Sequence, residues 1–193
     1  SGLGRFDGFR FSNYFNKAGD EQSLPNNVVD NVQEDVETNL WLHTAAGYCR
    51  FIRSESRFDS HLNQWMASKG MQGTPYYVKI DGRKNMWIAV HGHRVYYYNV
   101  RNKTAILFSL QGKGGRKLPK GTVSDMADDK DCAFMVYADG TIVKANGRQG
   151  RVLWVNNELK QRSNGRHRYY SIHVDRGRNL WVTYTGHTKV WNA

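Results

Sequence analysis

Histidines and regularly spaced aspartates are the residues of this 193-residue chain that could do chemistry. His91 and His93 flank a single glycine, so in a hairpin turn their imidazoles could converge on a metal ion or act as acid and base. A zinc site needs a third protein ligand, and neither a His-x3-His pattern nor a glutamate lies near this pair. No separate general base can be named either. We therefore predict no catalytic residue, no metal site and no cofactor.

The aspartates belong to a repeated motif in which an aromatic residue follows six positions later. The aromatic residues step by 46, 47 and 47 residues, and three copies carry Asn two places before the aromatic. Active sites are asymmetric whereas framework contacts recur, so we predict that each Asp and Asn caps a turn and that each aromatic packs between units. The four pairs are Asp35 and Trp41, Asp81 and Trp87, Asp128 and Phe134, and Asp175 and Trp181. In the third copy, Asp129 fits the upstream half of the motif better.

A period of 46 or 47 residues is the length of four short antiparallel strands, which is one blade of a β-propeller. β-like stretches precede each aspartate, and Gly-bearing turns follow each aromatic strand. A β-sandwich would give no reason for the fixed recurrence. We therefore predict an all-β fold, a β-propeller with four-stranded antiparallel blades, and a single domain over residues 1–193 that is a fragment of about four blades.

The predicted blade boundaries do not coincide with the ends of the chain. Either the N-terminal hairpin closes a four-bladed ring, or the open edges pair with other propeller blades or with a second copy of the chain. Residues 59–70 break the strand pattern and predict a short helix, with Asp59 or Ser60 as N-cap and Gly70 as its stop. Residues 1–22 are assigned to the end of a blade, residues 28–72, 75–118 and 122–165 to three whole blades, and residues 169–193 to the start of another.

The first copy of the motif closely resembles the two-component-regulator propeller repeat. Its leading segment, residues 23–27 (Ser-Leu-Pro-Asn-Asn), is similar to the one that precedes that repeat, and the likeness covers nearly the whole chain. Later copies depart from the pattern, with Val90 in place of Thr and Cys132 in place of Asn. The matching residues of the first copy are Val29, Val32, Asp35, Asn39, Leu40, Trp41, Thr44 and Gly47.

This resemblance implies the periplasmic sensor region of a hybrid two-component histidine kinase, a protein class that commonly responds to oligosaccharides. The chain itself would then be a binding and signal-transmitting module and not an enzyme, and it would meet the membrane only through the missing part of its parent. The ligand contacts of the family are not part of the motif, so no ligand residue is carried over. Two alternatives stay open: a propeller lyase acting on a polysaccharide or small molecule, and a protein-interaction scaffold.

The formal net charge of +11 predicts attraction to an acidic partner. Nucleic acid, sulfated or uronic-acid polysaccharide and anionic membrane all fit the charge, but no nucleic-acid-binding signature is present, and nucleic acid is not expected. We predict an oligosaccharide, acidic in character, bound where cations and aromatic rings alternate, because guanidinium groups pair with carboxylate or sulfate. The candidate ligand-binding residues are His91, His93, Arg94, Tyr96, Arg166, His167 and Arg168.

Overall fold

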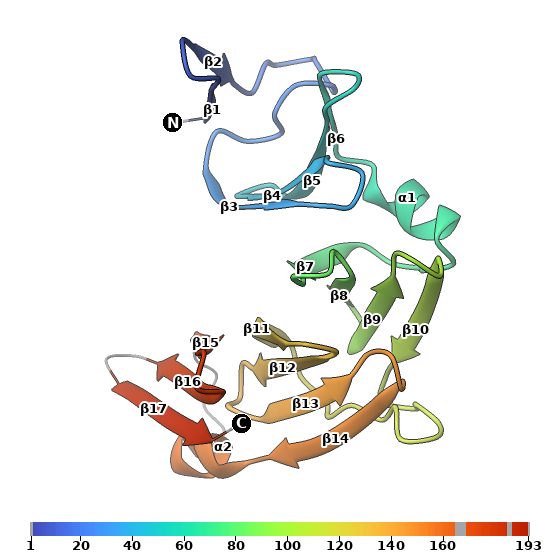
Figure 1. Ribbon diagram of the computed structural model, residues 1–193, viewed down its shortest axis with the longest axis vertical. Helices are drawn as coiled ribbons and strands as arrows, with labels where there is room; N and C mark the ends of the chain where they lie inside the picture. Colours follow the sequence, from blue (N-terminus) through green and yellow to red (C-terminus); the bar gives the residue numbers. More distant parts are fainter. Residues whose placement is uncertain (1, 165–168, 185–186, 193) are drawn as a thin grey trace. The chain divides into compact units, whose positions relative to one another are not determined.

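The computed structural model describes residues 2–164, 169–184 and 187–192, the last range by its backbone alone (Figure 1). The chain divides into two compact units, Ser1–Tyr76 and Tyr77–Ala193, with the boundary inside one strand. Every sheet is an antiparallel meander in which neighbouring strands follow one another in sequence. Neither of the two short helices in the described part of the chain is long and apolar enough to cross a membrane.

The first unit holds a two-stranded hairpin and a four-stranded sheet. Its core consists of apolar side chains such as Leu24, Leu42 and Phe58, and the ring of Tyr14 from the hairpin packs on Phe51 with centroids 5.1 Å apart. The hairpin is therefore tied to the larger sheet through aromatic contacts. The elements are β1 (Leu3–Phe6), β2 (Phe11–Tyr14), β3 (Val29–Glu34), β4 (Leu40–Thr44), β5 (Gly47–Ile52), β6 (Arg57–Asp59) and α1 (Leu62–Ser68).

The second unit holds two four-stranded sheets and a three-stranded sheet, which follow one another in Figure 1 with β7, β11 and β15 on the same side. We call the sheets β3–β6, β7–β10, β11–β14 and β15–β17 blades one to four. The elements are β7 (Pro75–Ile80), β8 (Met86–Val90), β9 (Arg94–Asn99), β10 (Thr104–Phe108), β11 (Val123–Asp129), β12 (Cys132–Tyr137), β13 (Ile142–Asn146), β14 (Arg151–Asn156), α2 (Glu158–Arg162), β15 (Tyr170–Val174), β16 (Asn179–Tyr184) and β17 (His187–Asn192).

These sheets confirm the predicted all-β fold and the four-stranded antiparallel blade. The predicted helix is also present, but its N-cap is His61 and not Asp59 or Ser60. Asp59 instead accepts a hydrogen bond from the backbone N–H of His61, 2.9 Å from its Oδ1, and so shapes the turn before the helix. The division of the chain into blades at the predicted residue boundaries, and its treatment as one domain, stay predictions.

The first strands of the second unit are joined by a shared carboxylate. Asp125 of β11 accepts a hydrogen bond from the hydroxyl of Tyr77 in β7, and its other oxygen lies 2.8 Å from the backbone nitrogen of Ile172 in β15. Between blades three and four the side chains of Phe134, Ile172 and others form one buried cluster. Polar and apolar contacts thus fix the spacing of successive blades in this unit.

Blades two and three are also held together by a close contact of a glycine with an aromatic ring. Gly147 follows β13 and lies against Tyr97 of β9, which is buried. A Cβ atom at position 147 would overlap carbon atoms of that ring. Because the ring is confined by its neighbours, it cannot give way without disturbing the packing of the two blades.

We expect Gly147→Ala to lower the free energy of unfolding by about 1–3 kcal/mol, the usual cost of overpacking a core. Urea unfolding followed by tryptophan fluorescence measures the change. Gly82→Ala is the matched control, since nothing lies within 4 Å of a Cβ there, and it should shift stability by no more than about 0.5 kcal/mol. Equal effects of the two substitutions would contradict the proposed contact.

Candidate functional site

The repeated aspartates cap the turns between the first and second strands, as predicted. Oδ1 of Asp81 lies 2.8 Å from the backbone nitrogen of Arg83 and 2.9 Å from that of Asn85. Asp35 accepts equivalent bonds from the N–H groups of Glu37 and Asn39, both at 2.9 Å. Buried backbone donors need partners, so these carboxylates are occupied by the fold.

The motif asparagine links two turns of the same blade. Oδ1 of Asn85 accepts a hydrogen bond from the backbone N–H of Val100, 3.2 Å away in the turn between β9 and β10. Asn39 makes the same 3.2 Å bond with the N–H of Arg53 in blade one. The turns at this end of a blade are therefore held as a pair, and side chains projecting from them start from fixed backbone positions.

The third copy uses Asp129 where the other copies use their motif aspartate, which corrects the assignment of Asp128. Strand pairing places Asp129 opposite Cys132, just as the hydrogen bond to Asn39 places Asp35 opposite Asn39 in blade one. The side chain of Phe134 has no N–H group, whereas Trp41 donates from Nε1 to Asp35 at 3.0 Å. Asp129 instead accepts a 2.7 Å bond from the guanidinium of Arg178.

The residue opposite the motif aromatic on the third strand differs from blade to blade. It is Arg50 opposite Trp41, Tyr97 opposite Trp87 and Lys144 opposite Phe134, by strand register. Arg50 stacks between Trp41 and Trp65 of α1, at 5.6 and 5.3 Å, Lys144 lies 4.6 Å from the centroid of Phe134, and Tyr97 is buried at the joint with blade three.

Tyr97 carries a buried hydroxyl group that makes no hydrogen bond of normal geometry with the described residues. Its pKa is raised to about 12, first by burial and then by the nearby carboxylates of Asp81 and Asp131, against weaker lowering effects of Asn99 and Arg148. The phenol is therefore neutral at physiological pH. Asp81 and Asp131 lie at the turns between the first and second strands of blades two and three.

Of the predicted ligand residues of blade two, His91 and His93 lie at the opposite end of the sheet, in the turn between β8 and β9, whereas Arg94 begins β9 and Tyr96 lies within it. Nδ1 of His93 lies 2.8 Å from the carbonyl oxygen of Gly121, and the guanidinium of Arg94 donates to the carbonyl of His91 at 3.4 Å. Tyr96 is buried with 5% of its surface exposed. The structure brings the two histidines and Arg94 together, and ligand binding by them stays a prediction.

The other predicted ligand residues, Arg166, His167 and Arg168, lie outside the described residues. Across the described ranges, no three His, Cys, Asp or Glu side chains are grouped as a metal site requires.

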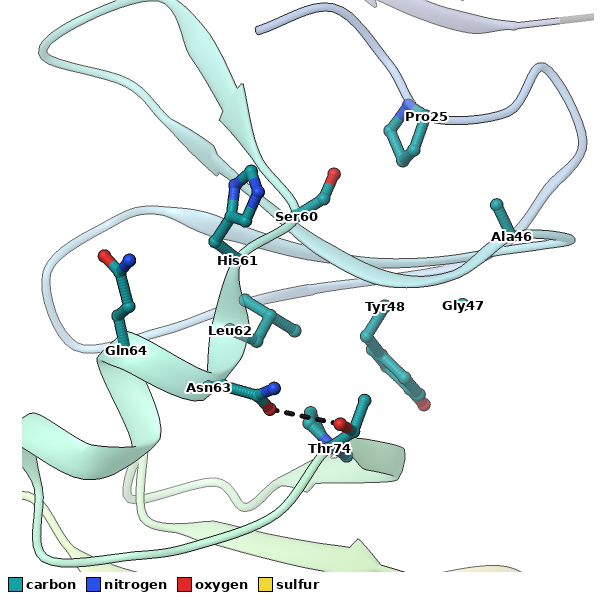
Figure 2. Close-up of a pocket in the computed structure, with 11 residues that line it drawn as sticks. Pro25, Ala46, Gly47, Tyr48, Ser60, His61, Leu62, Asn63, Gln64 and Thr74 are labelled. Carbon is teal, nitrogen blue, oxygen red and sulfur yellow. Dashed lines mark hydrogen bonds between the residues drawn. The ribbon is translucent and has the colours of Figure 1, made fainter. Parts of the chain in front are cut away.

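A cavity of about 400 Å³ opens beside α1 in the first unit (Figure 2). Its walls come from the turn between β4 and β5, the start of the helix and residues 74 and 75. Thr74 Oγ1 donates to Asn63 Oδ1 at 3.1 Å, and Figure 2 shows this pair on the wall near Leu62. His61 and Tyr48 are the only titratable side chains in its lining. We call it the helix pocket.

A second cavity, of about 460 Å³, lies between blades two and three, and we call it the arginine pocket. Apart from Asn99, the last residue of β9, its residues come from the turns at one end of the two blades. These turns are β7–β8 and β9–β10 in blade two and β11–β12 and β13–β14 in blade three. Asp131 contacts the guanidiniums of both Arg83 and Arg148, the second at 3.6 Å. The lining consists of Arg83, Asn85, Asn99, Val100, Arg101, Asn102, Asp131 and Arg148.

Sequence reasoning missed the arginine pocket because its residues are scattered over four turns that are far apart in the chain. Basic clusters contiguous in sequence attracted the prediction instead. A signal was present nonetheless: Arg83 follows the motif aspartate by two positions, and Asp131 comes 48 residues later, close to one repeat period. Turn residues spaced by one period lie at the same end of successive blades.

Solved structures similar to this chain include two extracellular domains of hybrid two component systems from B. thetaiotaomicron. The first has a TM-score of 0.59 and 16% identity and the second 0.65 and 13%, each over 94% of this chain. The chain spans only 23% and 22% of those two chains. The computationally designed protein Ika4 is also similar, with a TM-score of 0.57 and 12% identity over 94% of this chain and 98% of its own.

No protein-family model matches the sequence, and no curated protein matches it. At such low identity the structural likeness shows a shared fold and leaves function to be argued.

The fourth copy of the motif, in which the aromatic residue Trp181 is exposed, leads to a prediction about pH. The pKa of Asp175 is lowered to about 2, chiefly because Trp181 Nε1 donates to it at 2.8 Å, and then because of Asn179. Since the folded-state pKa lies below the usual 3.8, the carboxylate stabilises the fold above that pH, and the contribution is lost as pH falls through 2. We expect Trp181→Phe to raise the pKa of Asp175 toward 3.8.

Carboxyl carbon chemical shifts, recorded by NMR between pH 2 and 6, report this titration. The third copy already carries a phenylalanine at the aromatic position, so the substitution suits the framework. Trp154→Phe is the control, because Trp154 contacts Phe134 in blade three and should leave the titration of Asp175 unchanged. An unmoved pKa in Trp181→Phe would show that the indole does not set it.

Proposed function

We propose that this chain is a ligand-sensing segment of the periplasmic region of a hybrid two-component sensor histidine kinase, and that its ligand is an acidic oligosaccharide. The observation that carries the sensor role is the fold shared, over 94% of this chain, with extracellular domains of hybrid two component systems. Those domains are described as extracellular, which supports an extracytoplasmic place for this chain. The kinase itself would belong to another part of the parent protein.

A binding role is supported by how the repeated carboxylates are used. Asp35 and Asp81 are buried and accept backbone hydrogen bonds within their own turns, and Asp175 is held by an indole. A general acid or base must reach its substrate with a proton to give or a lone pair to accept one. Carboxylates that are engaged in the framework favour recognition over catalysis.

The acidic character of the ligand is supported by charge. The chain has 28 Lys and Arg against 17 Asp and Glu, a formal net charge of +11. Such a field raises the rate of encounter with anions and fixes no partner by itself. For a signal to reach a kinase, the ligand must also bind one arrangement of the sensor more tightly than another, because equal affinity shifts no population.

Isothermal titration calorimetry of the 193-residue chain tests the ligand class. We expect oligogalacturonate or heparin-derived oligosaccharides to bind, and the dissociation constant to rise several-fold between about 50 and 300 mM salt, since exposed charges are screened over roughly 8–10 Å in this range. Neutral xylo- and manno-oligosaccharides should give no heat of binding. Binding of the neutral sugars alone would refute the acidic-ligand proposal.

A further inference from the structure

We propose that the arginine pocket binds the oxyanion group of an acidic sugar, either the carboxylate of a uronic acid or a sulfate ester. This inference rests on the proposed acidic ligand and assigns it a place. Three guanidiniums, those of Arg83, Arg101 and Arg148, line the cavity with a single carboxylate, that of Asp131. Three positive charges against one negative charge leave an excess of two.

The three guanidinium groups of the pocket differ in how far they are paired with a carboxylate. Arg83 and Arg148 share Asp131, whose contact with Arg148 is 3.6 Å long. Arg101, on the turn between β9 and β10, is exposed and makes no hydrogen bond or ion pair with any residue in the described ranges. A guanidinium presents five N–H donors in a planar fork that matches two oxygens of a carboxylate or sulfate. The pocket therefore has guanidinium N–H donors that remain available to bind an anion.

The backbone that carries these side chains is fixed. Asp81 binds the N–H of Arg83 at 2.8 Å, and Asn85 joins that turn to the one that bears Arg101. In blade three, the backbone N–H of Gly147 donates to the carbonyl of Asp131 at 2.9 Å, which joins the turns of Asp131 and Arg148. Preorganised donors lose less entropy on binding, so they favour specific recognition.

Another inter-blade junction, in which two cations close on one buried carboxylate, gives a comparison. Between blades three and four, Arg178 donates to Asp129 at 2.7 Å, and Lys144 lies 3.7 Å from the same oxygen. The carboxylate there is 6% exposed and closes the junction from within. In the arginine pocket the carboxylate is more exposed and the cations surround an open volume, which is the arrangement expected of a binding site.

An anion in this pocket would contact both blades, since Arg83 and Arg101 come from blade two and Arg148 from blade three. Asp131 would compete with the ligand for Arg83 and Arg148, because both offer negative oxygens to the same donors. Asp131 therefore acts as an internal competitor of the ligand. Its removal should increase affinity, whereas loss of Arg101 should decrease it.

The experiment titrates the wild-type chain and its variants with trigalacturonate and with a heparin-derived tetrasaccharide, so that the carboxylate and sulfate sources are compared. Arg101→Ala should weaken binding roughly 10- to 100-fold, the effect of losing a charge-assisted hydrogen bond. Arg101→Lys should fall in between, because it keeps the charge and loses the fork. Asp131→Asn should strengthen binding several-fold.

Arg176→Ala is the matched control, since Arg176 is also an exposed turn arginine and its loss lowers the net charge equally. If Arg101→Ala and Arg176→Ala weaken binding to the same small extent, the pocket assignment is overturned while the acidic-ligand proposal stands. Failure of Asp131→Asn, properly folded by circular dichroism, to raise affinity would also count against the pocket.

A second titration keeps the pocket testable if no acidic sugar binds. Inorganic sulfate is added to the wild-type chain, and the side-chain Nε–H signals of arginine are followed by NMR. Shifts of the Arg101 and Arg148 signals without those of Arg176 would support the oxyanion site and leave only the sugar proposal refuted. Uniform shifts, or none, would overturn the site as well.

Discussion

The backbone N–H groups in the turn between the first two strands of a blade need hydrogen-bond acceptors, and the motif aspartate supplies them. Burial and hydrogen bonding act on this carboxylate in opposite directions. The pKa of Asp81 is raised, first by burial, although Asn85 and Arg83 donate to it. The pKa of Asp175, which is less buried, is lowered to about 2, because its hydrogen bonds outweigh a small burial effect. The aspartate thus forms the same turn whether its carboxylate is buried or partly exposed to solvent, which is why the motif can recur along the chain.

Because the motif aspartate holds the turn through backbone hydrogen bonds, the side chains that point outward from the turn are free to vary. Asp81 binds two backbone nitrogens, so the identity of the side chain at Arg83 does not decide whether the turn forms. Asn85 then fixes the neighbouring turn, where Arg101 projects. The third copy keeps this end of the blade together by another route, a backbone bond from Gly147 to Asp131. Recognition can therefore change from blade to blade at little cost to the fold.

Local patterning made most of the fold predictable. Alternating strands, Gly-bearing turns and the capping aspartates depend on residues close together in the chain, so their spacing revealed the blade. The site depended on contacts that sequence does not display. Tyr96 looked like a surface ring in a basic cluster, yet both faces of β9 are covered and the side chain is buried. The two-residue turn after Asp129 also shifted the third carboxylate by one position, because it is one residue shorter than the others.

The net charge of the chain and the local pairing of its cations affect ligand binding in different ways. Many cations of this chain are already engaged, as Lys160 is with Asp139 at 2.9 Å and Arg162 with Glu158 at 2.8 Å. Their long-range field still adds to the attraction of anions, but at physiological salt it is screened within roughly 8 Å. A screened field of this kind speeds encounter at close approach without choosing among anions. Choice among them requires donors in contact with the ligand, set at fixed positions and not yet neutralised. Arg101 is unpaired within the described part of the chain, and its turn is held by the bond between Val100 and Asn85, so it can supply such donors, whereas the total charge cannot.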